Sequence, residues 1–277
     1  MGPSTTAPRI LRVSRDGYDL HAEVIAPGTA DAPWIVFSNS LVTDLTIWDA
    51  QAHALAGRFG LLRYDQAGHG KSGQPGHGVD FDSLGRDVLA VMDAAGVRTA
   101  VFVGLSMGVP TGLAAHRLAA GRFDALVLSD GQAKTAPGGA AGWQERIAGA
   151  ASSGMAAFAQ ATADRWLSES AGPTMRARLV DMIAATSLEG FSLCATALMD
   201  YDYLSELGRI DCPTLLLAGA EDGAMPDSMA TKLLPAIAGA SMTVIPNAGH
   251  VPCFEQPEAF TAALSEFLDN ITSQVSA

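Results

Sequence analysis

Short runs of apolar residues, largely β-branched or leucine, recur along the chain and alternate with stretches in which apolar residues follow a helical spacing. Such runs are typical of strands covered on both faces, and their alternation with helices is typical of a mostly parallel sheet. The pattern predicts six central strands, at 34–38, 61–64, 100–104, 125–129, 214–219 and 242–245. Two earlier runs, 10–13 and 20–26, flank Asp16-Gly17, a dipeptide that favours a hairpin, so we expect the sheet to begin with an antiparallel pair.

Helical spacing of apolar residues predicts helices between these strands, at 47–56, 81–95, 107–119, 227–234 and 257–268. The clearest stripe follows Asp82 and consists of Leu84, Val88, Val91 and Met92. The predicted fold class is therefore α/β, with an eight-stranded, mostly parallel sheet flanked by helices.

Residues 131–208 interrupt this alternation. They hold no convincing strand, and helical patterns recur there at 144–149, 155–167, 175–186 and 193–198. Because the segment falls between two predicted strands of the sheet, we interpret it as a helical insertion that covers one end of the sheet. The predicted organisation is a first part of the core at 1–130, a helical cap at 131–208 and a second part of the core at 209–277.

Composition narrows the class of protein. Of 277 residues, 48% are hydrophobic and 17% are charged, which fits a large globular core and excludes intrinsic disorder. The 17 basic and 29 acidic side chains leave a net charge of −12, so the basic stripe of a nucleic-acid-binding protein is not expected. Neither a membrane span nor a secretion signal is visible, and the first eight residues read as a disordered lead-in. Three scattered cysteines, Cys194, Cys212 and Cys253, favour reduced thiols and a cytoplasmic protein.

The segment Gly104-Leu105-Ser106-Met107-Gly108 is the only G-x-S-x-G pattern in the chain. It falls between a predicted strand and a predicted helix, so Ser106 is expected at a sharp strand-to-helix turn. Glycines on both sides leave room for such a turn, which would expose the hydroxyl at the end of the sheet, and the helix N-terminus behind it favours negative charge nearby. This predicts Ser106 as a nucleophile; a plain glycine-rich turn with a capping serine is the alternative.

A serine hydroxyl needs a base that takes its proton and an acid that orients the base. Of six histidines, His250 is the best placed, because it lies in the loop after the last predicted strand, at the same edge of the sheet as Ser106. Asp222 follows the strand at 214–219 and gives the chain order Ser, Asp, His. Asp130 directly ends another strand and is a rival for the role of acid, and Glu221 is a third candidate.

With these blocks in place, the chain resembles the α/β-hydrolase superfamily and, within it, the 3-oxoadipate enol-lactonases. The resemblance runs from about Arg12 to Leu268. It rests on Ser38-Asn39-Ser40-Leu41, Trp48-Asp49, Leu62-Arg63-Tyr64-Asp65, Gly68-His69-Gly70, the segment at 104–108, the blocks around Asp222 and His250, and two cap segments, Trp143 to Ile147 and Arg165-Trp166. The departures are Ala67, Val109-Pro110 and Ser129-Asp130-Gly131. Val109 and Asp130 are expected near the pocket. There they would indicate a small substrate that differs from that of the enol-lactonases but is processed by the same catalytic residues.

The resemblance implies an α/β-hydrolase fold with a helical cap inserted after the sixth strand. It also implies that the backbone N–H groups of Leu41 and Met107 form an oxyanion hole, the pair of donors that a tetrahedral intermediate needs. Asn39 and Ser40 are expected to orient that loop and, with Asp130, to belong to the substrate-binding set. Ordinary turn chemistry is the alternative for Asn39 and Ser40.

The reaction implied is acyl transfer on a small ester or lactone, with no metal and no organic cofactor, in aromatic catabolism. A carboxylate-bearing substrate would be repelled by a chain of net charge −12 unless cations converge locally, so Arg146 and Arg165 are candidates for a carboxylate clamp. Trp143 and Trp166 are expected to wall the pocket. Surface exposure of both arginines and packing of both tryptophans inside the cap are the alternatives.

Four other functions remain open at this stage. They are a carboxylesterase, a cofactor-free perhydrolase on a less polar ester, a hydrolase of carbon–carbon bonds in ring-fission products, and a receptor with a hydrolase fold. The expected partner is a small, anionic ester or lactone, and neither nucleic acid nor a membrane is expected. A homodimer is left open beside a monomer.

Overall fold

An eight-stranded sheet forms the centre of the computed structural model, which describes residues 7–275. Its strand order is β1-β2-β4-β3-β5-β6-β7-β8. The strands are β1 (Arg9–Arg15), β2 (Tyr18–Ile25), β3 (Trp34–Ser38), β4 (Gly60–Tyr64), β5 (Ala100–Leu105), β6 (Phe123–Ser129), β7 (Thr214–Gly219) and β8 (Ser241–Ile245). β2 pairs antiparallel with β1 and β4, and every other pairing is parallel. The predicted fold class is confirmed.

Burial along the strands follows their place in the sheet. Every residue of β4, β5 and β7 is buried, as expected for strands covered on both faces, whereas only Ile245 is buried in the edge strand β8. The predicted hairpin joins β1 to β2 through Asp16-Gly17, where Gly17 has a φ of 87°. A two-residue hairpin turn needs this left-handed conformation, which glycine adopts without strain.

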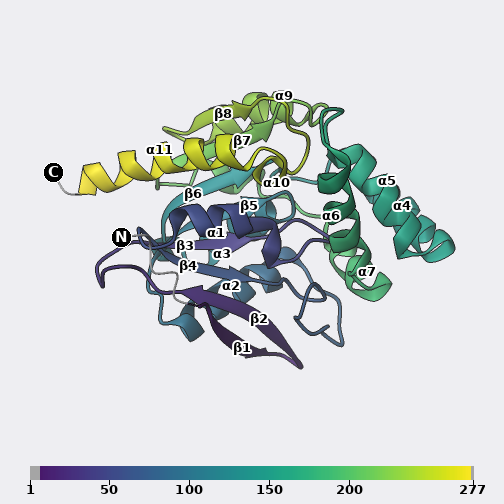
Figure 1. The fold of residues 1–277 in the computed structure, drawn as a ribbon, viewed down its shortest axis with the longest axis horizontal. Helices are drawn as coiled ribbons and strands as arrows, with labels where there is room; N and C mark the ends of the chain where they lie inside the picture. The colour runs from purple at the N-terminus through teal and green to yellow at the C-terminus, as the bar shows by residue number, and fades with distance from the viewer. Residues whose placement is uncertain (1–6, 276–277) are drawn as a thin grey trace.

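Helices cover both faces of the sheet (Figure 1). α1 (Asp49–Leu55) and α11 (Pro257–Val275) lie together on one face, and α2 (Phe81–Ala95) and α3 (Gly108–Leu118) lie together on the other. α2 begins at a capping box between Asp80 and Ser83 and ends at Gly96, which has a φ of 75°. The apolar stripe predicted for α2 is buried against the core.

Five helices lie between β6 and β7, and all fall within the segment interpreted as a cap. They are α4 (Gly139–Ser153), α5 (Met155–Trp166), α6 (Pro173–Ala184), α7 (Leu188–Ala197) and α8 (Leu204–Leu207). α4 is longer than the predicted 144–149 because its glycine- and alanine-rich ends carry little apolar periodicity. Figure 1 shows α4 to α7 grouped at one end of the sheet, so the cap stands over the strand ends rather than over a face.

One predicted helix has irregular geometry, and one short helix was not predicted. The residues expected as a helix at 227–234 are all helical, but they belong to three successive elements: α9 (Met225–Ser228), a π-helix η3 (Met229–Leu233) and a 3₁₀ turn η4 (Leu234–Ala236). The short helix α10 (Pro252–Glu255), directly after His250, was not predicted.

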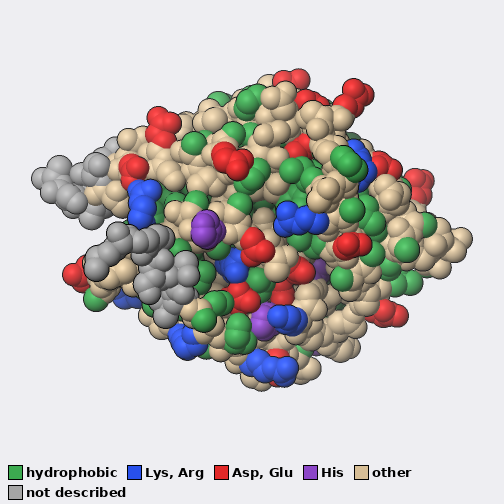
Figure 2. Space-filling model, in the orientation of Figure 1, with side chains coloured by type: hydrophobic (Ala, Val, Ile, Leu, Met, Phe, Trp, Pro, Cys, Tyr) green, Lys and Arg blue, Asp and Glu red, His purple; other side chains and the backbone are tan. Residues whose placement is uncertain are grey.

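The surface charge, the helix lengths and the N-terminal segment can be compared with the predictions from sequence. On the face shown in Figure 2, basic and acidic side chains of the described residues are interspersed. Within residues 7–275 no single helix is long and apolar enough to cross a membrane, and only α6 and α7 taken together, bent by 88°, reach that length and composition. The predicted lead-in lies outside the described residues as far as residue 6, and β1 begins at Arg9.

Candidate active site

The turn between β5 and α3 carries Ser106 in a strained conformation. Its φ is 54°, in the left-handed region that non-glycine residues rarely adopt. A Cβ at Gly104 would lie 2.5 Å from the carbonyl oxygen of Gly108, and one at Gly108 would lie 2.5 Å from the carbonyl oxygen of Ser38. The two flanking glycines therefore let the strand end, the helix start and β3 approach closely enough to form the turn.

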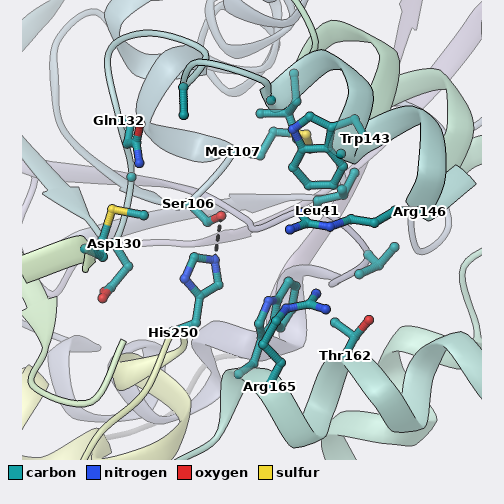
Figure 3. Close-up of a pocket in the computed structure, with 18 of the residues that line it drawn as sticks. Leu41, Ser106, Met107, Asp130, Gln132, Trp143, Arg146, Thr162, Arg165 and His250 are labelled. Atoms are coloured by element: carbon teal, nitrogen blue, oxygen red, sulfur yellow. Dashed lines mark hydrogen bonds between the residues drawn. The ribbon is translucent and has the colours of Figure 1, made fainter. Parts of the chain in front are cut away.

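A hydrogen-bonded relay starts at this serine. Nε2 of His250 lies 2.8 Å from Oγ of Ser106 (Figure 3), and Nδ1 of the same ring lies 2.7 Å from Oδ2 of Asp222. Ser106 follows β5, Asp222 follows β7 and His250 follows β8, so three loops at the same edge of the sheet supply the relay. The side chains of His250 and Asp222 are only 12% and 16% exposed, which protects these hydrogen bonds from competing water.

The other two candidate acids have different surroundings. Asp130 is fully buried, its Oδ1 accepts the N–H of Gly219 at 2.8 Å and its Oδ2 accepts the hydroxyl of Ser129 at 2.6 Å. Burial, followed by the negative charge of Asp222, raises the pKa of Asp130 well above its ordinary value. Glu221 is exposed. Asp222 is thus the only one of the three carboxylates within hydrogen-bond distance of His250.

The two residues predicted to form an oxyanion hole lie in the same pocket as Ser106. Leu41 and Met107 both line the pocket, and within the described part of the chain neither N–H donates a hydrogen bond to the protein. Buried N–H groups are almost always paired, so two unpaired ones beside a serine hydroxyl can receive an oxyanion. The adjacent Val42 has a φ of 55°, a rare conformation for a β-branched residue.

Asn39 and Ser40 were predicted as substrate-binding residues, but neither lines the pocket. Nδ2 of Asn39 donates to the carbonyl of Tyr64 at 2.9 Å, and its Oδ1 accepts the indole N–H of Trp48 at 3.0 Å. The carbonyl of Ser40 accepts the N–H and the hydroxyl of Thr43. Both residues instead brace the loop that presents Leu41.

The pocket has a volume of about 340 Å³, which suits a small molecule. Its cap side includes the four predicted residues, Trp143, Arg146, Arg165 and Trp166. Both arginines are exposed as well as lining the pocket, whereas Trp166 is buried. The guanidinium of Arg146 stacks on Trp143 at 4.5 Å, and the ring of Trp166 lies 5.0 Å from that of His250. Figure 3 shows both arginine side chains extending from the cap toward the space beside Ser106.

Neither Arg146 nor Arg165 forms an ion pair with a described carboxylate. Desolvation lowers the pKa of Arg146, and desolvation together with repulsion from Arg146 lowers the pKa of Arg165. Two unpaired positive charges that repel each other form a site to which an anion would be attracted.

Sequence reasoning missed four polar residues of the pocket wall, which are Gln132, Thr135, Thr162 and Tyr201. Thr162 is 1% exposed, and its hydroxyl has no partner among the described groups. It lies three residues before Arg165, on the same face of α5. This spacing is the one feature of the sequence that relates Thr162 to the pocket. Within residues 7–275, no three His, Cys, Asp or Glu side chains are placed to hold a metal ion.

Backbone strain is concentrated around the site. The four described non-glycine residues with positive φ are Val42, Ser106, Asp130 and Asn247. They follow β3, β5, β6 and β8, and each lies in a loop at the edge of the sheet that carries the relay. Strain of this kind persists where the surrounding structure enforces it, most often at active sites.

A strained serine at a strand-to-helix turn, a histidine and an acid on neighbouring loops and a helical cap over them define a class, the hydrolases of the α/β fold. A profile of the alpha/beta hydrolase family matches residues 24–263. The chain belongs to this family and is a hydrolase.

Similar proteins carry more specific names. Two 3-oxoadipate enol-lactonases of Acinetobacter baylyi are similar in sequence: one is 34% identical over 86% of this chain and 89% of its own, and the other is 31% identical over 95% and 97%. A solved structure of an enol-lactonase from Burkholderia xenovorans superimposes with a TM-score of 0.86 at 34% identity, covering 94% of this chain and all of that one.

Proposed function

We propose that the protein hydrolyses a small, carboxylate-bearing lactone or ester by acyl transfer to Ser106. The observation that carries the proposal is the relay from Ser106 through His250 to Asp222, which opens into a pocket where Arg146 and Arg165 have no carboxylate partner in the described chain. The names of the two Acinetobacter relatives and of the Burkholderia enol-lactonase give further support.

In the first half-reaction, Oγ of Ser106 attacks the substrate carbonyl while Nε2 of His250 takes the hydroxyl proton. The negative charge that develops on the carbonyl oxygen is stabilised by the N–H groups of Leu41 and Met107. The imidazolium, oriented by Asp222, gives its proton to the leaving oxygen as the ester bond breaks. Ring opening of an enol lactone in this way leaves an enol, which tautomerises to the ketone and draws the reaction forward.

In the second half-reaction, water attacks the acyl-enzyme, and His250 takes a proton from it as general base. A second oxyanion forms on the same carbonyl oxygen and collapses to expel Oγ of Ser106, which regains its proton from His250. The carboxylic acid leaves and the enzyme returns to its starting state. None of these steps consumes an oxidant, a reductant or a second substrate other than water.

The substrate class follows from charge. A chain of net charge −12 repels anions at a distance, so an anionic substrate needs a local cluster of cations. Arg146 and Arg165 supply such a cluster on the cap side of the pocket. A hydrolase for neutral esters has no need of two unpaired guanidinium groups there. The three free cysteines support a reducing, cytoplasmic location, and we propose aromatic catabolism as the setting.

Replacement of the nucleophile tests the mechanism. Ser106→Ala is expected to lower kcat for p-nitrophenyl acetate by about 10⁴-fold or more while leaving the thermal unfolding curve unchanged. Ser152→Ala, at an exposed serine of α4 in the cap, is the matched control and should retain full activity. Wild-type turnover by a folded Ser106→Ala protein would refute the serine mechanism.

A substrate screen tests the specificity. We expect kcat/KM for small enol lactones and esters that carry a free carboxylate to exceed that for their methyl-ester counterparts by about 10-fold or more, the value of one charge-assisted hydrogen bond. Indifference to the carboxylate would favour a general carboxylesterase and would contradict the enol-lactonase-like assignment. No turnover of any ester or lactone would favour a receptor.

A further inference from the structure

A buried carboxylate joins the cap to the loop that carries His250. Glu255, the last residue of α10, is 3% exposed. Its Oε1 accepts the backbone N–H of Ser168 at 2.9 Å and also the Ser168 hydroxyl, and its Oε2 accepts the N–H of Gly249 at 2.8 Å. Ser168 follows α5 in the cap, and Gly249 directly precedes His250. One side chain therefore ties together two segments that are far apart in the sequence.

Hydrogen-bond donors alone surround the carboxylate of Glu255. It receives three donors, and no described Lys, Arg or His forms an ion pair with it. Burial of a carboxylate is strongly unfavourable unless hydrogen bonds compensate it, and well-packed apolar residues can usually fill such a place at no loss of stability. The three donors compensate the burial of Glu255, and two of them are backbone N–H groups of the two segments that it joins.

Further contacts at the same place restrict the histidine. The N–H of His250 donates to the carbonyl of Trp166 at 2.7 Å, and the two rings are 5.0 Å apart. A Cβ at Gly249 would overlap that same carbonyl oxygen, and a Cβ at Gly219, the last residue of β7, would overlap the carbonyl of Gly249. The loop is thus held between the end of β7 and the end of α5.

We propose that Glu255 is a positioning residue for His250: it holds the histidine loop against the cap and so sets the imidazole between Ser106 and Asp222. This inference rests on the proposed function, since it takes His250 as the base. Glu255 touches neither substrate nor reacting atoms. A misplacement of about 1 Å in a reacting group lowers the rate by about 100-fold, so a loop anchor of this kind has a direct kinetic effect.

The contact between the end of α5 and the His250 loop also links a pocket arginine to the catalytic histidine. Arg165 lines the pocket and directly precedes Trp166, whose carbonyl receives the N–H of His250. A shift at Ser168 would therefore move the substrate-facing guanidinium and the catalytic imidazole relative to each other. Glu255 fixes that separation from outside the pocket.

Glu255→Gln tests the inference, because the amide keeps the shape but places an NH₂ group against one of the N–H donors. We expect kcat for p-nitrophenyl acetate to fall about 10–100-fold with KM changed less than about twofold. The low-field proton resonance of the His250 Nδ1–H, which reports its hydrogen bond to Asp222, should shift or broaden. Ser168→Ala removes one of the three donors and should lower kcat by a smaller factor of about 2–10. If Glu255→Gln fails to fold, the Ser168→Ala variant tests the positioning role of Glu255 in its place.

Glu266→Gln makes the same change at an exposed glutamate of α11 and should behave as wild type in all three measurements. Folded Glu255→Gln and Ser168→Ala proteins with unchanged kcat and an unchanged Nδ1 proton resonance would overturn the inference, even if their Tm were lower. Ser106→Ala, measured in parallel, separates this result from the proposed function. Full activity there would refute the serine mechanism, whereas the proton resonance still reports the position of the histidine without any turnover.

Discussion

Asp130 and Asp222 stand at the ends of neighbouring strands, and both line the pocket beside His250. Burial raises the pKa of Asp130, and the negative charge of Asp222 raises it further. Burial beside a second carboxylate disfavours the charged form, so the protonated form of Asp130 is favoured. This assignment agrees with the hydrogen bonds, since Asp222 is the partner of Nδ1 of His250.

The two aspartates should respond differently to removal of charge. Asp222→Asn is expected to lower kcat by about 10³–10⁴-fold, because the amide no longer holds the imidazole in the reactive tautomer. Asp130→Asn replaces a neutral acid by a neutral amide that can still accept the N–H of Gly219, so kcat should stay within about 10-fold of wild type. Steady-state kinetics on one activated ester compares them. A larger loss at Asp130 would make it the acid of the relay.

The raised pKa of Asp130 also predicts how stability depends on pH. The folded state binds a proton at Asp130 over a pH range in which the unfolded state has already lost it, so this contribution is fully present below pH ~4 and is lost as pH rises toward the folded pKa. Asp130→Asn removes the titration. The free energy of unfolding of the variant, relative to wild type, should therefore rise between pH 4 and pH 8.

Urea denaturation at several pH values measures this difference. Asp124→Asn, at an exposed aspartate of the same strand, is the matched control and should give a flat difference. A difference for Asp130→Asn that is constant or falls over the same range would show that Asp130 is ionised in the folded protein.

The fold and the relay were accessible from the sequence for the same reason. Strands leave short apolar runs, in the buried β5 and β7 and also in the edge strand β8, and Ser106, Asp222 and His250 each follow one of these runs, so parallel pairing brings them to one edge of the sheet. The hydrogen bonds of Glu255 to the cap correspond to no such pattern in the sequence. Its partner Ser168 is 87 residues away, and their contact depends on the path of the cap, which local patterns do not encode.

Some pocket residues could be predicted from the sequence, and others could not. Arg146 and Arg165 could be proposed because uncompensated charge stands out in an acidic chain. Thr162 could not, because a threonine inside an alanine-rich helix is ordinary until the fold places its hydroxyl in a pocket wall.

Neutral replacement of the cap arginines should separate binding from chemistry. Arg165→Met and Arg146→Met keep much of the apolar stem and remove the charge. We expect each to raise KM for a carboxylate-bearing lactone by about 10–100-fold and to change KM for a neutral ester less than about threefold. Arg209→Met removes an arginine that is 75% exposed and outside the pocket, and should change neither value. Equal losses on both substrates would indicate a structural role in the cap.

The close approach of the histidine loop to the cap predicts a strict requirement for glycine at position 249. A Cβ there would overlap the carbonyl oxygen of Trp166, so Gly249→Ala must push the loop away from α5. We expect kcat to fall about 10–100-fold and the Tm to drop by several degrees, because overpacking of this kind costs about 1–3 kcal/mol. Gly208→Ala is the control, since that glycine has a φ of −70° and open space around its Cβ position. A folded Gly249→Ala enzyme with wild-type kcat would show that the position of His250 does not depend on its contact with the cap.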